Sequence, residues 1–304
     1  MAALKGKAVV ITGAGRGIGE AYARLAAAEG AKVVVNDVDL GEAERVAKAI
    51  RADGGEALAK VADVASWDDA ERLVAFCVDR YGSLDGLVNN AALYHMALPD
   101  EETEARVRKL FEVNVLGTAF CGYAALRRML KQRSGSLVNI TSGAHSGMRG
   151  MSAYGGSKGA VASMTYSWAI DTEGTGVRVN SVSPMALTRM YEEYSRFQNQ
   201  HGQGAQQPGL SIAPGNNAPL VVYLLSDLAA GVHGQVVRVQ GPEINIVTHP
   251  AALYPGVERE QWTVAEVAKA FDTRLAAQQL PTGVQSYEVK VRNYDVTWQA
   301  QSEK

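Results

Sequence analysis

The stretch that decides the fold lies near the N-terminus, where residues 7–26 read Lys-Ala-Val-Val-Ile-Thr-Gly-Ala-Gly-Arg-Gly-Ile-Gly-Glu-Ala-Tyr-Ala-Arg-Leu-Ala. A β-branched run leads into a glycine-rich turn and then into a helical stretch. Glycines let the chain turn sharply and let a pyrophosphate approach the backbone, while a helix N-terminus offers unpaired N–H groups to an anion. The segment therefore predicts a dinucleotide-binding loop, although Ile18 stands where the G-x-G-x-x-G fingerprint would place its third glycine.

Short β-branched runs alternate with longer helical stretches up to about residue 240, which is typical of βαβ units around a parallel sheet. We expect strands at 7–12, 32–37, 57–61, 84–88, 136–140, 177–182 and 235–239. Helices are expected near 18–29, 40–53, 66–81, 101–131, 152–173 and 216–227. Several strand runs are apolar throughout, which indicates that helices cover both sheet faces. The pattern predicts an α/β, Rossmann-like doubly wound domain over residues 1–245, with a mostly parallel seven-stranded sheet.

Two regions depart from this rhythm. Residues 197–210 are polar and rich in Gly and Gln, so we expect a mobile surface segment, which is either a solvated loop or a lid over a substrate. Residues 246–304 form a C-terminal extension, which we expect to pack on the core or on a neighbouring subunit. Within it, Thr263 and Glu266 have the spacing of a capping box and predict a helix that ends near Leu275.

The composition argues against several classes of function. With 30 Lys+Arg against 32 Asp+Glu, the net charge of −2 offers no electrostatic footprint for nucleic acid or for an anionic membrane. No apolar stretch approaches the roughly 18 residues of a membrane span, and the first residues lack the features of a signal peptide. Cys77 and Cys121 lie in apolar surroundings and are expected to be reduced core residues. We expect a cytoplasmic protein with neither a nucleic-acid nor a membrane partner.

Acidic residues follow the second and third predicted strands. Asp37 ends the second strand, where its carboxylate can accept hydrogen bonds from ribose hydroxyls. This favours NAD over NADP, because a 2′-phosphate would face a like charge, although Arg16 could offset part of that repulsion. Asp37 could instead cap the next helix. Asp63, after the third strand, has the chemistry to bind an adenine amino group but could equally be a turn residue.

The strongest chemical signal is Tyr154-Gly155-Gly156-Ser157-Lys158, at the start of a predicted helix. A spacing of four residues puts the phenol and the ammonium on one helix face. Tyrosine at its usual pKa of about 10 is a poor base near neutrality, but an adjacent ammonium favours the phenolate and lowers that pKa. The pair predicts a proton-transfer centre. The two glycines disfavour a helix, which suggests that a ligand or another backbone segment passes close by.

Together these motifs resemble the short-chain dehydrogenase/reductase family, whose members carry T-G-x-x-x-G-x-G and Y-x-x-x-K, and the resemblance spans roughly residues 5 to 240. Residues 89–92, Asn-Asn-Ala-Ala, match the family's N-N-A-G turn, which lines the cofactor cleft, with Ala in place of the final Gly. The resemblance implies that Asn114 holds a water in a proton relay beside the lysine. It also implies that a serine before Tyr154 binds the substrate oxygen.

The position of that serine has two candidates. The family usually places it thirteen residues before the tyrosine, whereas Ser142 lies twelve residues before Tyr154 and Thr141 lies thirteen before it. Because residues 139–142 align with the family's strand-end pattern, we assign Ser142 and keep Thr141 as the alternative. After the sixth strand, Pro184 matches the family's Pro-Gly with Met185 in place of the glycine. Thr188 matches the threonine that binds the nicotinamide carboxamide.

The resemblance implies reversible hydride transfer between NAD and a secondary alcohol or ketone, without a metal. Tyr154 is expected to act as general acid and base, with Asn114, Ser142 and Lys158 completing the catalytic set. The expected cofactor-binding residues are Gly13, Arg16, Gly17, Ile18, Gly19, Asp37, Asp63, Val64, Asn90, Ala91, Tyr154, Lys158, Pro184 and Thr188. Family members are usually tetramers or dimers, so we expect a homo-oligomer, such as a homotetramer, that acts on a small molecule.

The fold does not decide the substrate. A set of apolar and adaptable residues would line a pocket if their loops converge: Tyr94, His95, Met96, Met148, Met151, Met185, Leu187, Met190, Tyr191 and Tyr194. This predicts a medium-to-large apolar substrate, such as a hydroxyacyl thioester, a steroid or a cyclic or aromatic alcohol. His145 could touch the substrate or be a loop histidine with local bonds. The alternative function is an NAD-binding regulator with little turnover, which would not need the Ser, Tyr and Lys set.

Overall fold

The computed structural model describes residues 2–185, 189–202, 213–250 and 256–278. Contacts within the chain separate residues 1–253 from residues 254–304, and each unit is described by itself. The larger unit contains the predicted α/β domain. Among the described residues, none of the helices is both long enough and apolar enough to cross a membrane.

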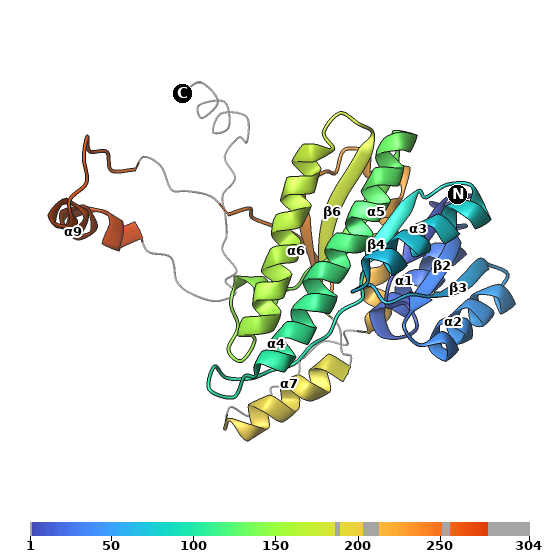
Figure 1. The fold of residues 1–304 in the computed structure, drawn as a ribbon, viewed down its shortest axis with the longest axis horizontal. Helices are drawn as coiled ribbons and strands as arrows, with labels where there is room; N and C mark the ends of the chain where they lie inside the picture. The colour runs from blue at the N-terminus through green and yellow to red at the C-terminus, as the bar shows by residue number, and fades with distance from the viewer. Residues whose placement is uncertain (1, 186–188, 203–212, 251–255, 279–304) are drawn as a thin grey trace. The chain divides into compact units, whose positions relative to one another are not determined.

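One eight-stranded sheet forms the centre of the larger unit, in the order β3-β2-β1-β4-β5-β6-β7-β8 (Figure 1). The strands are β1 Ala8–Ile11, β2 Lys32–Asp37, β3 Glu56–Val61, β4 Gly86–Asn89, β5 Gly135–Ile140, β6 Val177–Pro184, β7 Val236–Gln240 and β8 Glu243–Val247. Strands β1 to β7 pair in parallel, and β8 is antiparallel to β7. The strand order reverses between β1 and β4, and doubly wound sheets bind ligands at the carboxyl ends of the strands at such a point.

The seven predicted strands are all present, and β8 is an eighth that the sequence analysis did not predict. Gln240 pairs with Glu243, so a two-residue turn connects β7 to β8, and its first residue, Gly241, has φ +60°. Glycine at the first central position suits the tight turns of hairpins. Ile244 and Ile246 lie 62% and 57% exposed on this edge strand. Their alternation with polar residues was the available signal, and β8 runs past the boundary predicted at residue 245.

Helices cover both faces of the sheet, as the apolar strands predicted. The helices of the larger unit are α1 Gly17–Ala28, α2 Leu40–Ala52, α3 Trp67–Tyr81, α4 Glu104–Phe111, α5 Gly117–Gln132, α6 Ser152–Asp171, α7 Arg189–Gln200 and α8 Ala218–Leu225. Val9 and Ile11 of β1 pack with α1, α2 and α8, whereas Val10 packs on the other face with α3, α5 and α6. Because successive strand residues point to opposite faces, each helix layer receives its own apolar row.

The single helix predicted near 101–131 is instead two helices joined by a π-helical turn, Glu112–Leu116. Such a turn holds one residue more than an α-helical turn and is frequently found at functional sites. It places Asn114 at 0% exposure. The apolar pattern alone could not reveal the extra residue, because both flanking segments keep a helical period.

The polar segment predicted at 197–210 begins as helix. Helix α7 continues to Gln200, and Phe197 is buried at 5% exposure against Gly150. The prediction of a mobile surface segment was wrong for residues 197–200, because one aromatic anchor outweighs the polar composition around it. Residues 203–210 lie outside the described residues.

In the second unit, helix α9, Val264–Thr273, confirms the predicted capping box. The Glu266 N–H donates to Thr263 Oγ1 at 3.2 Å, and the Thr263 N–H donates to Glu266 Oε2 at 3.1 Å. These two bonds satisfy N–H groups that the first turn of a helix otherwise leaves unpaired.

Candidate active site

The glycine-rich loop joins β1 to α1 at the carboxyl edge of the sheet. Gly13 has φ +59°, and a Cβ atom there would lie 2.8 Å from the Ala91 Cα. A Cβ at Gly19 would overlap the Gly13 carbonyl oxygen and lie 2.5 Å from Asn90 Nδ2. The close packing therefore requires glycine at position 19, one residue later than the G-x-G-x-x-G fingerprint, and this explains why Ile18 is tolerated.

The Asn90 turn after β4 holds this loop in place. Asn90 Nδ2 donates to the Thr12 and Gly13 carbonyl oxygens at 2.9 and 3.0 Å. Thr12 Oγ1 accepts from the Asn90 and Ala91 N–H groups at 3.0 and 3.1 Å. Threonine and asparagine thus brace β1 against β4 at the point where the strand order reverses.

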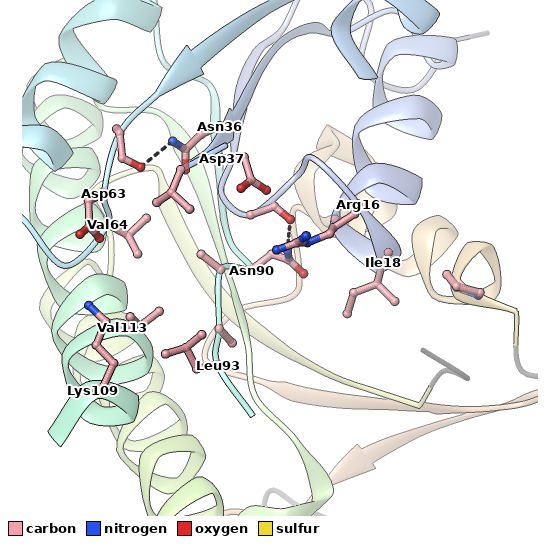
Figure 2. Close-up of a pocket in the computed structure, with 18 residues that line it drawn as sticks. Arg16, Ile18, Asn36, Asp37, Asp63, Val64, Asn90, Leu93, Lys109 and Val113 are labelled. Atoms are coloured by element: carbon pink, nitrogen blue, oxygen red, sulfur yellow. Dashed lines mark hydrogen bonds between the residues drawn. The ribbon is translucent and has the colours of Figure 1, made fainter. Parts of the chain in front are cut away.

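A cavity of about 650 Å³ opens beside the loop (Figure 2). Predicted cofactor residues that line it are Gly13, Arg16, Gly17, Ile18, Gly19, Asp37, Asp63, Val64, Asn90 and Ala91. Ala92, from the predicted Asn-Asn-Ala-Ala turn, also lines it, and the lining residues that were not predicted are Asn36, Val38, Ala62, Leu93, Lys109, Val113 and Pro214. Lys109 and Val113 lie one helical turn apart and come from a distant segment, and Pro214 is more distant still. Only the tertiary fold brings them to the cavity.

Tyr154, Lys158 and Pro184, also predicted to bind the cofactor, are not among the residues that line this cavity. Thr188 lies outside the described residues. Pro184 ends β6, and the Met185 N–H donates to the Val239 carbonyl oxygen at 3.1 Å. Met185 in place of glycine therefore leaves this segment attached to β7.

The acidic residues of the cavity have defined partners. Asp37, 7% exposed, accepts from the Gly15 N–H at 3.1 Å and from the Asp39 N–H at 3.2 Å. Asp63 accepts from the Ala65 N–H at 2.9 Å, so it is a turn residue that also lines the cavity. The predicted capping role of Asp37 belongs instead to Asp39, which caps α2.

These features fit a dinucleotide. The α1 N-cap, Arg16, makes no side-chain capping bond, so the first N–H groups of α1 remain available to an anion. The glycine cradle leaves no room for side chains at Gly13 and Gly19, and the Asp37 carboxylate lines the cavity at the end of β2.

The side-chain directions distinguish the two candidates for the substrate-oxygen residue. The Ser142 hydroxyl, after β5, lies near enough to the Tyr154 phenol to lower the pKa of that phenol, and Ser142 Oγ accepts from the Ala144 N–H at 3.2 Å. Thr141 is buried, and its Oγ1 donates to the Lys158 carbonyl oxygen at 2.8 Å, on the backbone of α6. Ser142 is therefore beside the phenol, whereas the Thr141 hydroxyl is occupied elsewhere.

Burial controls the protonation of Tyr154 and Lys158, which are 7% and 3% exposed. It raises the pKa of Tyr154 to about 12, against the lowering effect of the nearby Ser142 hydroxyl, and it lowers the pKa of Lys158 to about 8. Lys158 Nζ lies 5.8 Å from the Tyr154 ring centroid and donates to the Ile140 carbonyl oxygen at 2.7 Å. Burial therefore moves the pKa of Tyr154 in the direction opposite to the one predicted from the neighbouring ammonium.

Asn114 uses its side-chain amide within the protein. Nδ2 donates to the Leu93 carbonyl oxygen at 2.9 Å and to Ser157 Oγ at 3.1 Å, and Oδ1 accepts from the Leu93 N–H at 2.7 Å. Ser157 in turn donates to the Tyr154 carbonyl oxygen at 2.7 Å. In this arrangement the Asn114 side chain joins the segment after β4 to α6, and both of its amide hydrogens are taken, which leaves neither for the predicted water.

The loop between β5 and α6 explains two features of the sequence. A Cβ at Gly155 would lie 2.5 Å from the Ala144 carbonyl oxygen, so a backbone segment does pass close to this glycine, as its position in the helix suggested. His145 bonds through Nδ1 to the Ser142 carbonyl oxygen. It therefore has the local bond of a loop histidine.

Tyr154 belongs to a cluster of apolar side chains. Its buried members are Met96, Leu110, Ala144, Met151, Tyr154 and Phe197, with Tyr94, Leu98 and Tyr194 partly buried against them. Of the predicted lining residues, Tyr94, Met96, Met151 and Tyr194 meet here. His95 instead pairs with Glu102 at 2.8 Å, and Met148 is 41% exposed. Leu187 and the side chains of Met190 and Tyr191 are outside the described part of the chain.

A model of the short chain dehydrogenase family matches residues 7–199, and this decides the family. The chain belongs to the short chain dehydrogenases. It is 37% identical over 248 residues to 2-(S)-hydroxypropyl-CoM dehydrogenase 3 of Xanthobacter autotrophicus, which covers 78% of this chain and 96% of the relative. It is 37% identical over 239 residues to cis-4-hydroxycyclohexanecarboxylate dehydrogenase of Sinomonas cyclohexanicum, covering 77% and 95% of the two chains.

The crystal structure of a short chain dehydrogenase from Mycobacterium avium has the same fold. It matches with a TM-score of 0.80 and 31% identity, covering 94% of this chain and 100% of the other. The comparisons confirm the predicted family and the Rossmann-like fold. This short chain dehydrogenase is an oxidoreductase of a family that uses a nicotinamide cofactor, NAD or NADP.

Proposed function

We propose that this enzyme interconverts a secondary alcohol and a ketone with NAD, using Tyr154 as general acid and base. The observation that carries the proposal is the proximity of the Ser142 hydroxyl to the Tyr154 phenol, at the edge of the sheet that also holds the glycine loop. A phenol and a hydroxyl that converge in a buried site can bind one oxygen between them and move its proton.

The proposed roles follow from the geometry. Ser142 fixes the substrate oxygen, and the Tyr154 phenol takes the alcohol proton in oxidation or supplies it in reduction. A bound nicotinamide cofactor supplies the chemistry of accepting or donating the hydride. The buried Lys158 ammonium stabilises negative charge on the phenol oxygen, which desolvation otherwise disfavours. The hydrogen bonds that the Asn114 side chain makes to Leu93 and Ser157 hold the segment after β4 and helix α6 in position.

We propose NAD in preference to NADP because of Asp37. Its carboxylate lines the cavity at the end of β2, where a 2′-phosphate would meet a like charge. Arg16 lines the same cavity and is the residue that would oppose this effect.

The substrate we propose is a medium-to-large secondary alcohol with an apolar body. The cluster of aromatic and methionine side chains around Tyr154 supports this, because such residues adapt to apolar shapes. Two of the relatives are named for a hydroxypropyl group and for a hydroxycyclohexane ring. Both names describe secondary alcohols.

A homo-oligomer remains a prediction, which exposed apolar side chains on two helices support. Tyr123 and Leu130 on α5 are 45% and 40% exposed, and Ile170 on α6 is 74% exposed. Association would remove these side chains from water. A monomer mass by light scattering at micromolar concentration would refute the prediction.

The test is formation of reduced cofactor from a panel of secondary alcohols, with NAD⁺ and NADP⁺ in parallel. We expect turnover with NAD⁺, loss of turnover in Tyr154→Phe, and a gain of NADP⁺ binding in Asp37→Asn measured by calorimetry. If the wild-type enzyme oxidises none of the alcohols while NAD⁺ still raises its melting temperature, the alternative of an NAD-binding regulator is favoured. Equal turnover by Tyr154→Phe and wild type would refute the proposed mechanism.

A further inference from the structure

Tyr94 lies against the reacting phenol and has no role in the mechanism above. Its ring makes an edge contact with the Tyr154 ring, with centroids 4.9 Å apart and planes at 82°. The preceding residue, Leu93, is fixed by two hydrogen bonds, since its N–H donates to Asn114 Oδ1 and its carbonyl oxygen accepts from Asn114 Nδ2. The position of Tyr94 is therefore set by the same asparagine that braces α6.

The Tyr94 hydroxyl makes no hydrogen bond with any residue in the described part of the chain. The side chain is only partly exposed, and its burial raises the pKa of the phenol, as do the nearby Tyr154, Glu193 and Tyr194. The phenol therefore stays protonated and can donate a hydrogen bond. A ligand in the site can supply the acceptor.

The surroundings restrict the charge of that acceptor. Glu193 of α7 approaches the same segment, since its Oε1 accepts from the Met96 N–H at 3.3 Å. A carboxylate on the substrate would meet this negative charge in a site of low dielectric. A neutral oxygen, in a hydroxyl or a carbonyl group, would not.

We propose that Tyr94 is a specificity-determining residue whose hydroxyl donates to a second, neutral oxygen of the substrate. Because the two rings are in contact, a molecule whose carbinol is held by the Tyr154 phenol lies beside Tyr94. The preferred substrates are therefore vicinal diols or hydroxyketones on an apolar body. This inference rests on the proposed function and names the substrate class of the same site.

The experiment compares kcat/KM for cyclohexanol and for its vicinal diol, with NAD⁺, in wild type, Tyr94→Phe and Tyr81→Phe. A neutral hydrogen bond predicts that wild type prefers the diol by about three- to tenfold. In Tyr94→Phe the ratio of the two kcat/KM values should fall to about one, because the ring contact with Tyr154 remains and only the hydroxyl is lost. Tyr81, at the end of α3, also has a hydroxyl without a partner, so Tyr81→Phe is the matched control and should keep the preference.

The outcomes separate the two proposals. A diol preference that is the same in wild type and Tyr94→Phe overturns the role of Tyr94, and so does turnover of both alcohols without any preference. Absence of turnover with either alcohol in all three proteins, with NAD⁺ binding intact, contradicts the proposed function and removes this inference with it. Melting curves by circular dichroism confirm that the variants are folded before the ratios are compared.

Discussion

Replacing Lys158 by methionine tests whether the active site contains a buried charge that destabilises the fold. The ammonium has one hydrogen-bond acceptor, the Ile140 carbonyl oxygen, and lies 3% exposed on α6. Burial lowers its pKa from the ordinary 10.5 to about 8. Below pH 8 the folded protein holds a charge that the unfolded chain exposes to water, and methionine of similar length removes that charge.

The size and the sign of this effect on the free energy of unfolding follow from the number of protons that the folded and unfolded states bind. Between the two pKa values the unfolded state binds the proton and the folded state does not, so stability rises with pH across this range. At about 1.4 kcal/mol per pKa unit, the penalty in the wild type is about 3 kcal/mol at pH 7 and about 1 kcal/mol at pH 10. The free energy of unfolding of wild type, relative to Lys158→Met, should therefore increase by about 2 kcal/mol from pH 7 to pH 10.

Urea unfolding followed by circular dichroism at several pH values between 7 and 10 measures this difference, at one protein concentration throughout. Phenols that ionise near pH 10 change the free energy of unfolding of both proteins equally, so they do not change the difference between wild type and Lys158→Met. The control is Lys48→Met, at an exposed position on α2, for which the difference should not change with pH. If the difference in the free energy of unfolding between wild type and Lys158→Met also does not change with pH, the reasoning is refuted, because the ammonium would then be solvated.

Two further predictions concern residues that fix the site. Gly19→Ala should abolish cofactor binding measured by calorimetry, because its Cβ would overlap the Gly13 carbonyl oxygen. Gly159→Ala, in open space on α6, should stabilise the fold by about 0.5–1 kcal/mol in urea unfolding. Normal cofactor binding by Gly19→Ala would show that the glycine loop can shift to make room for the methyl group. Ser142→Ala should lower kcat at least tenfold and should lower stability by about 1 kcal/mol, because the Ala144 N–H loses its side-chain acceptor. Thr141→Val should leave kcat little changed and lower stability by about 0.5–1.5 kcal/mol, because the Lys158 carbonyl oxygen loses one of its donors. A large loss of kcat in Thr141→Val but not in Ser142→Ala would restore the threonine as the substrate-oxygen residue.

The chemistry of the glycine loop was predictable because it depends on local sequence. A strand, a glycine-rich turn and a helix specify both the conformation of the loop and its anion-binding N–H groups. Every loop residue that was predicted to bind the cofactor lines the cavity. The choice between Ser142 and Thr141 was not predictable from spacing. Adjacent residues point in different directions, and only the positions of Tyr154 and the Lys158 backbone show which hydroxyl is occupied.

Other parts of the site depend on contacts between distant segments. Pro214 reaches the cavity from a segment almost 200 residues beyond the glycine loop, and Phe197 is buried within a polar stretch. The pKa of Tyr154 was predicted in the wrong direction, because the sequence shows the neighbouring charge but not the depth of burial. Local patterns predicted which groups are present, and tertiary packing determined their environment.

The π-helical turn at Glu112–Leu116 makes the length of this segment critical. Deleting one residue there would restore a continuous α-helix and rotate α5 by about 100° relative to α4. Leu110 on α4 and Cys121 on α5, both buried, could then no longer face the protein together. Substitutions in this segment keep α4 and α5 in phase, whereas a gain or loss of a single codon would separate the Asn114 brace from the core that supports it.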